Sequence, residues 1–210
     1  MIIFVTPDKR NTYARYVHQY LKLRKKVFCD EYGWVSPNPD GTERDFLDDG
    51  YSIYILSIDT ANDCTAGGVR VSPTTGPTLL HSCWCELLPD PDDFRSPNIW
   101  EATRFCVDDS QTTGRNKNFA NRVTLALTLS ILDFAAKNGI SSIIAVCETR
   151  FIDLFGVYTE KPEVISSTTD ENGCEISCVI WSSVEALAAS LNWARPFHAG
   201  EEPTKLQAAE

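Results

Sequence analysis

The sequence lacks an excess of positive charge, and it lacks a long apolar run. It holds 19 Lys and Arg residues against 29 Asp and Glu residues, so the 210-residue chain has a net charge of −10. A general nucleic-acid binder needs a positive field that attracts phosphates, and this class is therefore disfavoured. No stretch approaches the ~18 consecutive apolar residues that a membrane span requires. The apolar start, MIIFV, has no basic residues ahead of it and predicts a strand rather than a signal peptide, so we expect a cytoplasmic location.

Several motifs with a defined chemistry are absent as well. The chain has no G-x-G-x-x-G or Walker sequence, and none of its eight cysteines has C-x-x-C spacing. His81, Cys83 and Cys85 would share one face of a strand predicted over residues 79–87. A fourth ligand is missing, however, and their neighbour Trp84 is typical of a core residue. We therefore expect no metal site.

The chain does hold enough apolar side chains, at 43% of its residues, for a sizeable core. Its periodicities predict strands over 2–5, 51–59, 65–72, 79–87, 100–108, 142–147, 162–167 and 174–181, and helices over ~11–31, 119–138, 149–156 and 184–191. This order predicts an α/β (α+β sandwich) fold, in which one mixed sheet carries helices on its faces. We expect a single domain over residues 1–195 and a polar tail over residues 196–210.

The strand predicted over residues 100–108 carries two charges, Glu101 and Arg104. Buried charges are costly unless they are paired, so both require partners. On a regular strand, side chains three residues apart face opposite ways. If both belong to one site, the strand must contain a bulge or a bend between them.

The expected partners come from other segments. Arg24 lies on the apolar stripe of the first helix, although alone it would also be explained by a side chain that extends to water. Arg70 lies on the strand over residues 65–72. The loop over residues 33–50 is long for a compact domain and supplies Asp45 and Asp48. Two further acids of this loop are interpreted as solvated, namely Glu43 and Asp49. A buried network is costly for stability alone and favours a cleft for a charged or zwitterionic substrate.

Eight residues at this spacing resemble the signature of the acyl-homoserine-lactone synthases, the autoinducer synthases of bacterial quorum sensing. The match runs through R-x-x-x-F, a loop Trp, D-x-x-D, a strand Arg and W-E-x-x-R-F, and it covers residues ~20–110. The residues are Arg24, Phe28, Trp34, Asp45, Asp48, Arg70, Glu101 and Arg104. One departure is Trp84, where the family usually has Phe; this changes the shape of the pocket.

The resemblance implies a fold similar to the GNAT N-acetyltransferases, with a twisted mixed sheet and a V-shaped cleft for the acyl donor. It implies an acyltransferase whose substrates are S-adenosylmethionine and an acyl thioester, without a tightly bound cofactor. The amine attacks the thioester, the methionyl carboxylate closes the lactone, and methylthioadenosine leaves.

The resemblance also implies roles for the residues. Glu101 is the first choice for the base that deprotonates the attacking ammonium, and Asp45 is the second. Phe28 and Trp34 offer aromatic faces to the sulfonium. Strand N–H groups near Phe105 would stabilise the oxyanion. The residues expected to hold the substrate and the loop are Arg24, Asp48, Arg70 and Arg104.

Two more groups complete the expected site. The acyl pocket is expected at Trp84, Trp100, Ile143 and Ala145. A Gly/Thr turn before the long helix would bind donor phosphate, or would only cap the helix. Its residues are Thr113, Gly114, Arg115 and Lys117.

The donor is expected to be acyl-CoA, with acyl carrier protein as the alternative partner, since an acidic carrier needs a basic docking patch. The candidates for such a patch are Lys22, Lys25, Lys26, Arg115, Lys117 and Arg122. Residues 143–147 lack the Thr that accompanies 3-oxo chains in the family, which predicts an unsubstituted or branched chain. Trp84 and Trp100 favour a small or flat one. Two alternatives stay open, an N-acyltransferase that forms no lactone and a non-catalytic ligand-binding module.

Overall fold

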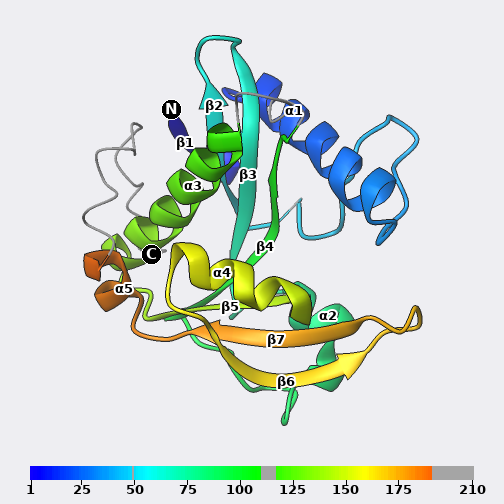
Figure 1. Cartoon of the computed structure of the whole chain (residues 1–210), viewed down its shortest axis with the longest axis vertical. Coiled ribbons are helices and arrows are strands. Elements are labelled where there is room, and N and C mark those ends of the chain that lie inside the picture. The colour runs from blue at the N-terminus through cyan, green and yellow to red at the C-terminus, as the bar shows by residue number, and fades with distance from the viewer. Residues whose placement is uncertain (49, 110–116, 191–210) are drawn as a thin grey trace. The chain divides into compact units, whose positions relative to one another are not determined.

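The computed structural model describes residues 1–48, 50–109 and 117–190 (Figure 1). Seven strands form one mixed sheet in the order β1-β2-β3-β4-β5-β7-β6, which confirms the predicted fold class. The described chain divides into two compact units. The first comprises residues 1–70 and 104–130, and the second comprises residues 71–103 and 131–190. The strands β3 and β4 each run from one unit into the other.

Most predicted elements are present, with bounds shifted by a few residues. The strands are β1 (Ile2–Val5), β2 (Ile53–Asp59), β3 (Cys64–Pro73), β4 (Ile99–Val107), β5 (Ser142–Glu148), β6 (Glu163–Thr169) and β7 (Glu175–Trp181). The helices are α1 (Ala14–Arg24), α2 (Leu79–Cys83), α3 (Lys117–Lys137), α4 (Ile152–Tyr158) and α5 (Val184–Ser190). Short 3₁₀ turns are η1 (Pro7–Lys9), η3 (Cys85–Leu87) and η5 (Thr149–Phe151). Among the described residues, no helix is long and apolar enough to cross a membrane.

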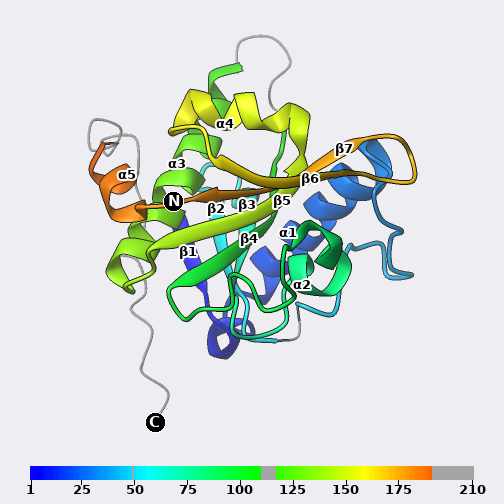
Figure 2. The same cartoon turned by 90° about the horizontal axis from the view of Figure 1, so that it is seen from below.

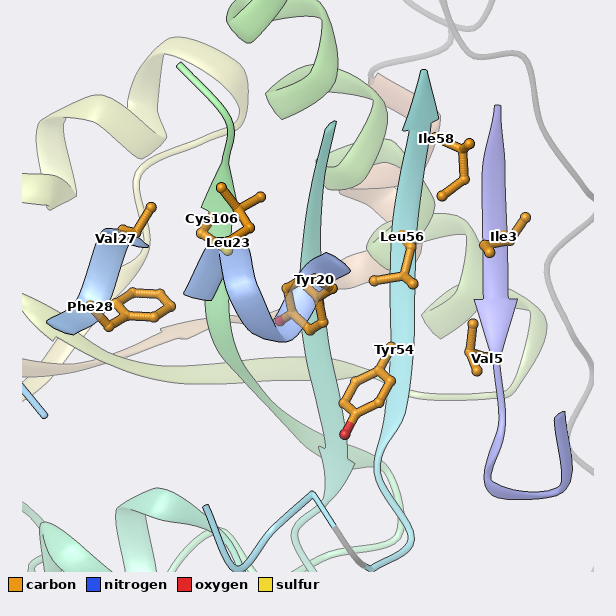
Figure 3. Close-up of a cluster of buried hydrophobic side chains, with 10 residues drawn as sticks. All are labelled: Ile3, Val5, Tyr20, Leu23, Val27, Phe28, Tyr54, Leu56, Ile58 and Cys106. Atoms are coloured by element: carbon orange, nitrogen blue, oxygen red, sulfur yellow. The ribbon is translucent and has the colours of Figure 1, made fainter. Parts of the chain in front are cut away.

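In the first unit, helices cover both faces of the sheet. A side-chain carbon added at Gly67 would meet Val123 and Leu127 of α3, whereas one added at Gly68 would meet Tyr20 of α1. Because consecutive strand residues face opposite ways, α1 and α3 lie on opposite faces of β3. The α1 face carries a buried apolar cluster of side chains from α1, the segment that follows it (η2, Lys25–Glu31), β1, β2 and β4 (Figure 3).

The first helix changes its geometry at its end. The predicted helix over ~11–31 is α-helical only to Arg24 and continues as a π-helical segment, η2 (Lys25–Glu31). The amide of Tyr32 donates to the carbonyl of Val27 at 3.0 Å, which closes a wider turn. π-Helical segments are rare in proteins, and those that occur often lie at functional sites. Here the segment carries Phe28, one of the predicted site residues.

In the second unit, β7 pairs antiparallel with β5 on one side and with β6 on the other. Ala145 of β5 lies opposite Val179, and Thr168 of β6 lies opposite Ile176. The helices α2 and α4 lie on opposite sides of these strands (Figure 2). The α2 side holds a buried apolar cluster that includes Leu80, Ile144 and Cys178. On the other side, Phe155 of α4 meets Trp181 edge-on at 5.1 Å.

The strand predicted over residues 79–87 is wrong, because this segment forms α2 and η3 instead. Two side chains cap the helix. The Thr78 hydroxyl accepts a hydrogen bond from the amide of His81 at 3.1 Å, and Glu101 accepts from the first two amides of the helix. These caps supply hydrogen-bond acceptors for amides at the start of α2, which have no partner within the helix. The resulting stabilisation of the helix outweighs the preference of the apolar and aromatic side chains for a strand. The strand face that would have aligned His81, Cys83 and Cys85 therefore does not exist.

Candidate active site

Arg24 is the centre of a buried ion network in the first unit. Its side chain is fully buried. Nη1 and Nη2 donate to the two carboxylate oxygens of Asp48 at 2.7 and 3.0 Å, and Nε donates to Glu43 at 2.5 Å. Charge-assisted bonds with this two-pronged geometry are strong and fix orientation. The burial of Arg24 excludes the interpretation that its side chain extends to water.

Two more arginines extend the network. Arg70, also fully buried, donates to both oxygens of Asp45 at 2.5 and 2.9 Å, and it lies 3.0 Å from Asp48. Arg104 lies 3.1 Å from Glu43 and 2.9 Å from Asp45. Three guanidinium groups thus face three carboxylates, and their charges balance. The side chains of Arg104 and Asp45 are 12% and 16% exposed, whereas those of Arg24 and Asp48 are at most 1% exposed.

The interpretation of Glu43 as a solvated residue is wrong. It is 2% exposed and bonds both Arg24 and Arg104. The sequence carried no signal for this, because Glu101 could equally supply the third carboxylate for the three arginines, and only the structure shows that Glu101 caps α2 instead. The second acid interpreted as solvated, Asp49, lies outside the described residues.

The network keeps its members charged. Burial opposes the charge of Asp48, but the hydrogen bond from Arg24 and the charges of Arg24 and Arg70 outweigh it and lower the pKa of Asp48. Burial also opposes the charge of Arg24, yet Tyr20 and the two carboxylate partners raise its pKa. The hydroxyl of Tyr54 donates to Asp48 at 2.8 Å, and burial followed by that carboxylate raises the pKa of Tyr54.

An aromatic stack lies beside the network. Phe28 and Trp34 are stacked at 5.7 Å between ring centroids, and Trp34 stacks on Tyr32 at 4.7 Å. The guanidinium carbon of Arg104 lies 5.6 Å from the centre of the Phe28 ring. Trp34 and Tyr32 are 43% and 41% exposed. The stack therefore offers aromatic surface to solvent next to the most exposed guanidinium of the network.

In the second unit, Glu101 is fully buried and is held by main-chain donors. Its two oxygens accept hydrogen bonds from the amides of Leu79 and Leu80 at 2.8 and 2.7 Å. The carboxylate thereby caps the start of α2 and has one fixed orientation. Sequence reasoning identified this residue but not its donors, because residues 79–87 were predicted to be a strand.

The irregularity predicted in this strand is confirmed at Arg104. Its φ is 56°, in the left-handed region that a non-glycine residue rarely adopts. The Tyr20 hydroxyl donates to the Arg104 carbonyl at 2.7 Å and holds this conformation. A left-handed residue interrupts the regular alternation of side chains along β4 at this position. Phe105, half-buried, follows directly.

The four residues predicted to line an acyl pocket do not share one face. Trp84 packs against the cluster that contains Leu80 and Ile144, on the α2 side. Trp100 meets Phe134 of α3 edge-on at 5.4 Å. Ile143 pairs with Trp100 in register and alternates with Ile144, so Ile143 and Ala145 face away from Trp84. A single pocket with these four walls is therefore wrong.

The predicted phosphate turn cannot be placed. Thr113, Gly114 and Arg115 lie outside the described residues, and Lys117 begins α3. Within the described residues, no group of three or more His, Cys, Asp or Glu side chains is arranged to hold a metal ion.

A family model described as autoinducer synthase matches residues 8–168 of the chain. The chain belongs to the autoinducer synthase family. The match spans the whole ion network, the aromatic stack and Glu101. Membership confirms the resemblance and makes the chain an acyltransferase. The non-catalytic ligand-binding module is therefore set aside.

Individual proteins support the same assignment. The acyl-homoserine-lactone synthase of Agrobacterium fabrum is 31% identical over 150 residues, which are 71% of this chain and 71% of that relative. A solved CoA-dependent acyl-homoserine lactone synthase, with SAM and isopentyl-CoA, has a TM-score of 0.76 at 23% identity and covers 91% of this chain and 87% of its own. An acyl-CoA N-acyltransferase from Pseudomonas aeruginosa reaches 0.56 at 11% identity, with coverages of 87% and 99%. These two structures establish the likeness of fold to acyltransferases.

Proposed function

We propose that this chain is an acyl-homoserine-lactone synthase that transfers an acyl group from acyl-CoA to the amine of S-adenosylmethionine. The observation that carries this proposal is the balanced ion network beside the Phe28–Trp34 stack. A neutral set of fixed charges suits a zwitterionic amino acid, and an exposed aromatic face suits a sulfonium. Both features lie within the family match.

The exposure of the network members divides their roles. Arg24, Arg70 and Asp48 are buried and form ion pairs within the network, so they position the loop. Arg104 and Asp45 reach solvent in part and are the members that would touch substrate. Arg104 would bind the methionyl carboxylate, and Asp45 the ammonium.

The proposed reaction has two steps. A base takes a proton from the ammonium, and the amine nitrogen attacks the thioester carbon, so that an amide forms and the coenzyme A thiol leaves with a proton. A methionyl carboxylate oxygen then attacks the γ-carbon and breaks its bond to sulfur, which closes the lactone. The sulfonium leaves as neutral methylthioadenosine.

Glu101 remains the first choice for the base, directly or through a water molecule. Two amide donors fix its carboxylate in one orientation, as a positioned base requires. Asp45 is less suited, because it forms ion pairs with two arginines, Arg70 and Arg104, whereas the main-chain amides that donate to Glu101 are uncharged.

The register of the second unit supports a place for the donor. Between β4 and β5, the parallel pairing of the described residues covers only Ile99↔Ser142 to Glu101↔Ile144. From Ala145 to Glu148, β5 pairs with β7 on its other side. An extended pantetheine arm would bind such a strand edge through main-chain hydrogen bonds.

The lysines support acyl-CoA over acyl carrier protein as the donor. Lys25 lies 2.8 Å from Asp30, and Lys26 lies 3.1 and 3.0 Å from Asp108 and Asp109. Lysines that already face carboxylates make a poor docking patch for an acidic carrier. The solved relative that is CoA-dependent and holds isopentyl-CoA points the same way, toward a short branched chain.

We propose that the acyl chain binds beside Trp84 on the α2 side of the second unit, next to the cluster that contains Leu80, Ile144 and Val146. Trp84 would limit the length of the chain, and Trp100, Ile143 and Ala145 would serve as core. The cytoplasm, where both substrates occur, is the proposed location, and residues 1–195 are the proposed single synthase domain.

The test is incubation of the purified chain with S-adenosylmethionine and acyl-CoAs of different chain lengths, with methylthioadenosine and acyl-homoserine lactone measured by mass spectrometry. We expect both products with a short branched donor. Acyl transfer to another amine without methylthioadenosine would instead support the non-lactonising N-acyltransferase. Turnover with an acylated acyl carrier protein, but with none of the acyl-CoAs, would overturn the assignment of acyl-CoA as the donor.

A further inference from the structure

Arg10 gathers the end of the acidic loop, which we define as residues 42–48 and 50–52. Arg10 directly follows η1, and its side chain contacts the acidic loop although the two lie far apart in the sequence. Its Nη1 donates to the carbonyl oxygen of Asp48, and its Nη2 donates to the carbonyls of Ser52 and Gly50 at 3.0 and 3.4 Å. One guanidinium thus binds three carbonyl groups of a segment whose described residues form no strand.

Tyr54 supports the same guanidinium from the sheet. The guanidinium carbon of Arg10 lies 5.1 Å from the centre of the Tyr54 ring. The hydroxyl of that ring donates to the carboxylate of Asp48 at 2.8 Å. Arg10 and Tyr54 therefore hold Asp48 at its main chain and at its side chain. Asp48 in turn accepts the two bonds from Arg24 and one from the amide of Asp45 at 2.8 Å.

The placement of Arg10 carries an energetic cost. Its Nε is buried and has no hydrogen-bond partner among the described residues. A buried donor without an acceptor loses its hydrogen bonds to water and gains none in the protein. An ordinary surface arginine would keep its Nε in contact with water. The carbonyl contacts and the aromatic ring must offset this cost, so the guanidinium is committed to the loop.

We propose that Arg10 is a positioning residue for the S-adenosylmethionine site. It fixes the acidic loop in the conformation in which Asp48 meets Arg24, and Asp45 meets Arg70 and Arg104. Without it, the loop would populate other conformations, and the apparent affinity would fall by the fraction of molecules that remain competent. The kinetic part of this inference rests on the proposed function, whereas the structural part does not.

The structural part is tested by amide hydrogen exchange in the full chain. Three loop amides have defined acceptors within the loop, those of Asp45, Leu47 and Asp48. We expect Arg10→Met to speed their exchange by about tenfold or more, because the open states of the loop become more populated. Arg10→Lys, a flexible point charge, should give an intermediate increase.

Arg15→Met is the matched control. Arg15 also binds a carbonyl and lies over a ring, with Asp63 and Tyr16 as partners, but it is exposed and has no contact with the network. This variant should leave the three amides unchanged. Equal exchange in Arg10→Met and the wild type would overturn the proposal, as would an equal increase in Arg15→Met.

The kinetic part separates positioning from general destabilisation. We expect Arg10→Met to raise KM for S-adenosylmethionine about tenfold, with kcat and KM for the acyl donor within about twofold of the wild type. Equal increases of both KM values, or a collapse of kcat at saturating substrate, would overturn it. If the wild type does not turn over S-adenosylmethionine, the proposed function fails, and the exchange measurement still decides the role of Arg10.

Discussion

Arg24 and Asp48 form a two-pronged ion pair inside the first unit, with Nη1 and Nη2 at 2.7 and 3.0 Å from the two carboxylate oxygens. Both side chains are at most 1% exposed. Each group would lose a buried counter-charge without the other. Among the described residues, Arg24 would then keep only Glu43, and Asp48 only Arg70, as a charged partner.

Replacement of Arg24 by Met should destabilise the protein by about 3–5 kcal/mol, because Asp48 and Glu43 lose a buried counter-charge. The measurement is chemical denaturation followed by circular dichroism. Lys25→Met is the control, since Lys25 is partly exposed and its ion pair with Asp30 is a surface pair worth at most about 1 kcal/mol. Similar losses in both variants would contradict the central place of Arg24.

Acid should weaken the contribution of Asp48 to stability. Its pKa in the folded state lies below the unfolded value of about 3.9, so the unfolded state binds more protons and stability rises with pH in this range. The contribution is complete above pH ~4 and is lost as the pH falls toward the folded pKa. The gap in unfolding free energy between the wild type and Asp48→Asn should therefore narrow below pH ~4. A gap that stays constant from pH 6 to 3 would count against the shift.

Tyr20→Phe should impair catalysis more than its effect on stability suggests. The hydroxyl is the hydrogen-bond donor to the carbonyl of Arg104, whose left-handed conformation costs about 1–2 kcal/mol. We expect a stability loss of about 1 kcal/mol and a higher KM for S-adenosylmethionine, because Arg104 is displaced. Tyr16→Phe removes the donor to exposed Asp63 and is the matched control. Identical kinetics in the wild type and Tyr20→Phe would show that this bond does not position Arg104.

Glu101→Gln should lower turnover by roughly 10²-fold or more if this carboxylate is the base. Glutamine keeps the shape, but it offers one oxygen where the carboxylate offers two to the amides of Leu79 and Leu80. A loss caused only by a weakened helix start would appear equally in Thr78→Ala, which removes the neighbouring cap at a cost of about 1 kcal/mol. Equal activity losses in the two variants would assign Glu101 to capping alone.

Gly68→Ala should destabilise the first unit by about 1–3 kcal/mol through overpacking. The added carbon would lie 2.7 Å from Leu56 and from the ring of Tyr20, in the middle of the cluster under α1. Gly76→Ala is the control, because its nearest neighbour, the carbonyl of Pro73, is 3.8 Å away. Thermal unfolding of both variants checks this; equal midpoints would contradict the close packing of α1 on β3.

The sequence predicted the parts of the fold that periodicity and pairing demand. A buried Arg24 on an apolar stripe requires carboxylates, and this expectation holds. An irregular strand was expected if Glu101 and Arg104 belong to one site, and β4 is irregular at Arg104, whereas a shared site stays a prediction. The sequence could not predict that the third acid is Glu43, because a loop carboxylate looks the same whether it points to water or to the core.

The helical structure around Trp84 could not be predicted from the sequence, for a different reason. The apolar content of this segment is compatible with a strand, and the helix depends on a cap that comes from Glu101, more than twenty residues away. The same error affected the predicted acyl pocket, because Trp84 was assigned to a strand and instead directly follows α2. Arg10 was missed because nothing local distinguishes it from a surface arginine.

We propose that this chain both acylates S-adenosylmethionine and closes the lactone. The ratio of methylthioadenosine to acyl-homoserine lactone, formed by the purified chain from S-adenosylmethionine and a branched short-chain acyl-CoA, tests this directly. Acylation followed by lactone closure should give equal amounts of the two products throughout the reaction. Acylated product that accumulates without methylthioadenosine would show that this chain does not close the lactone.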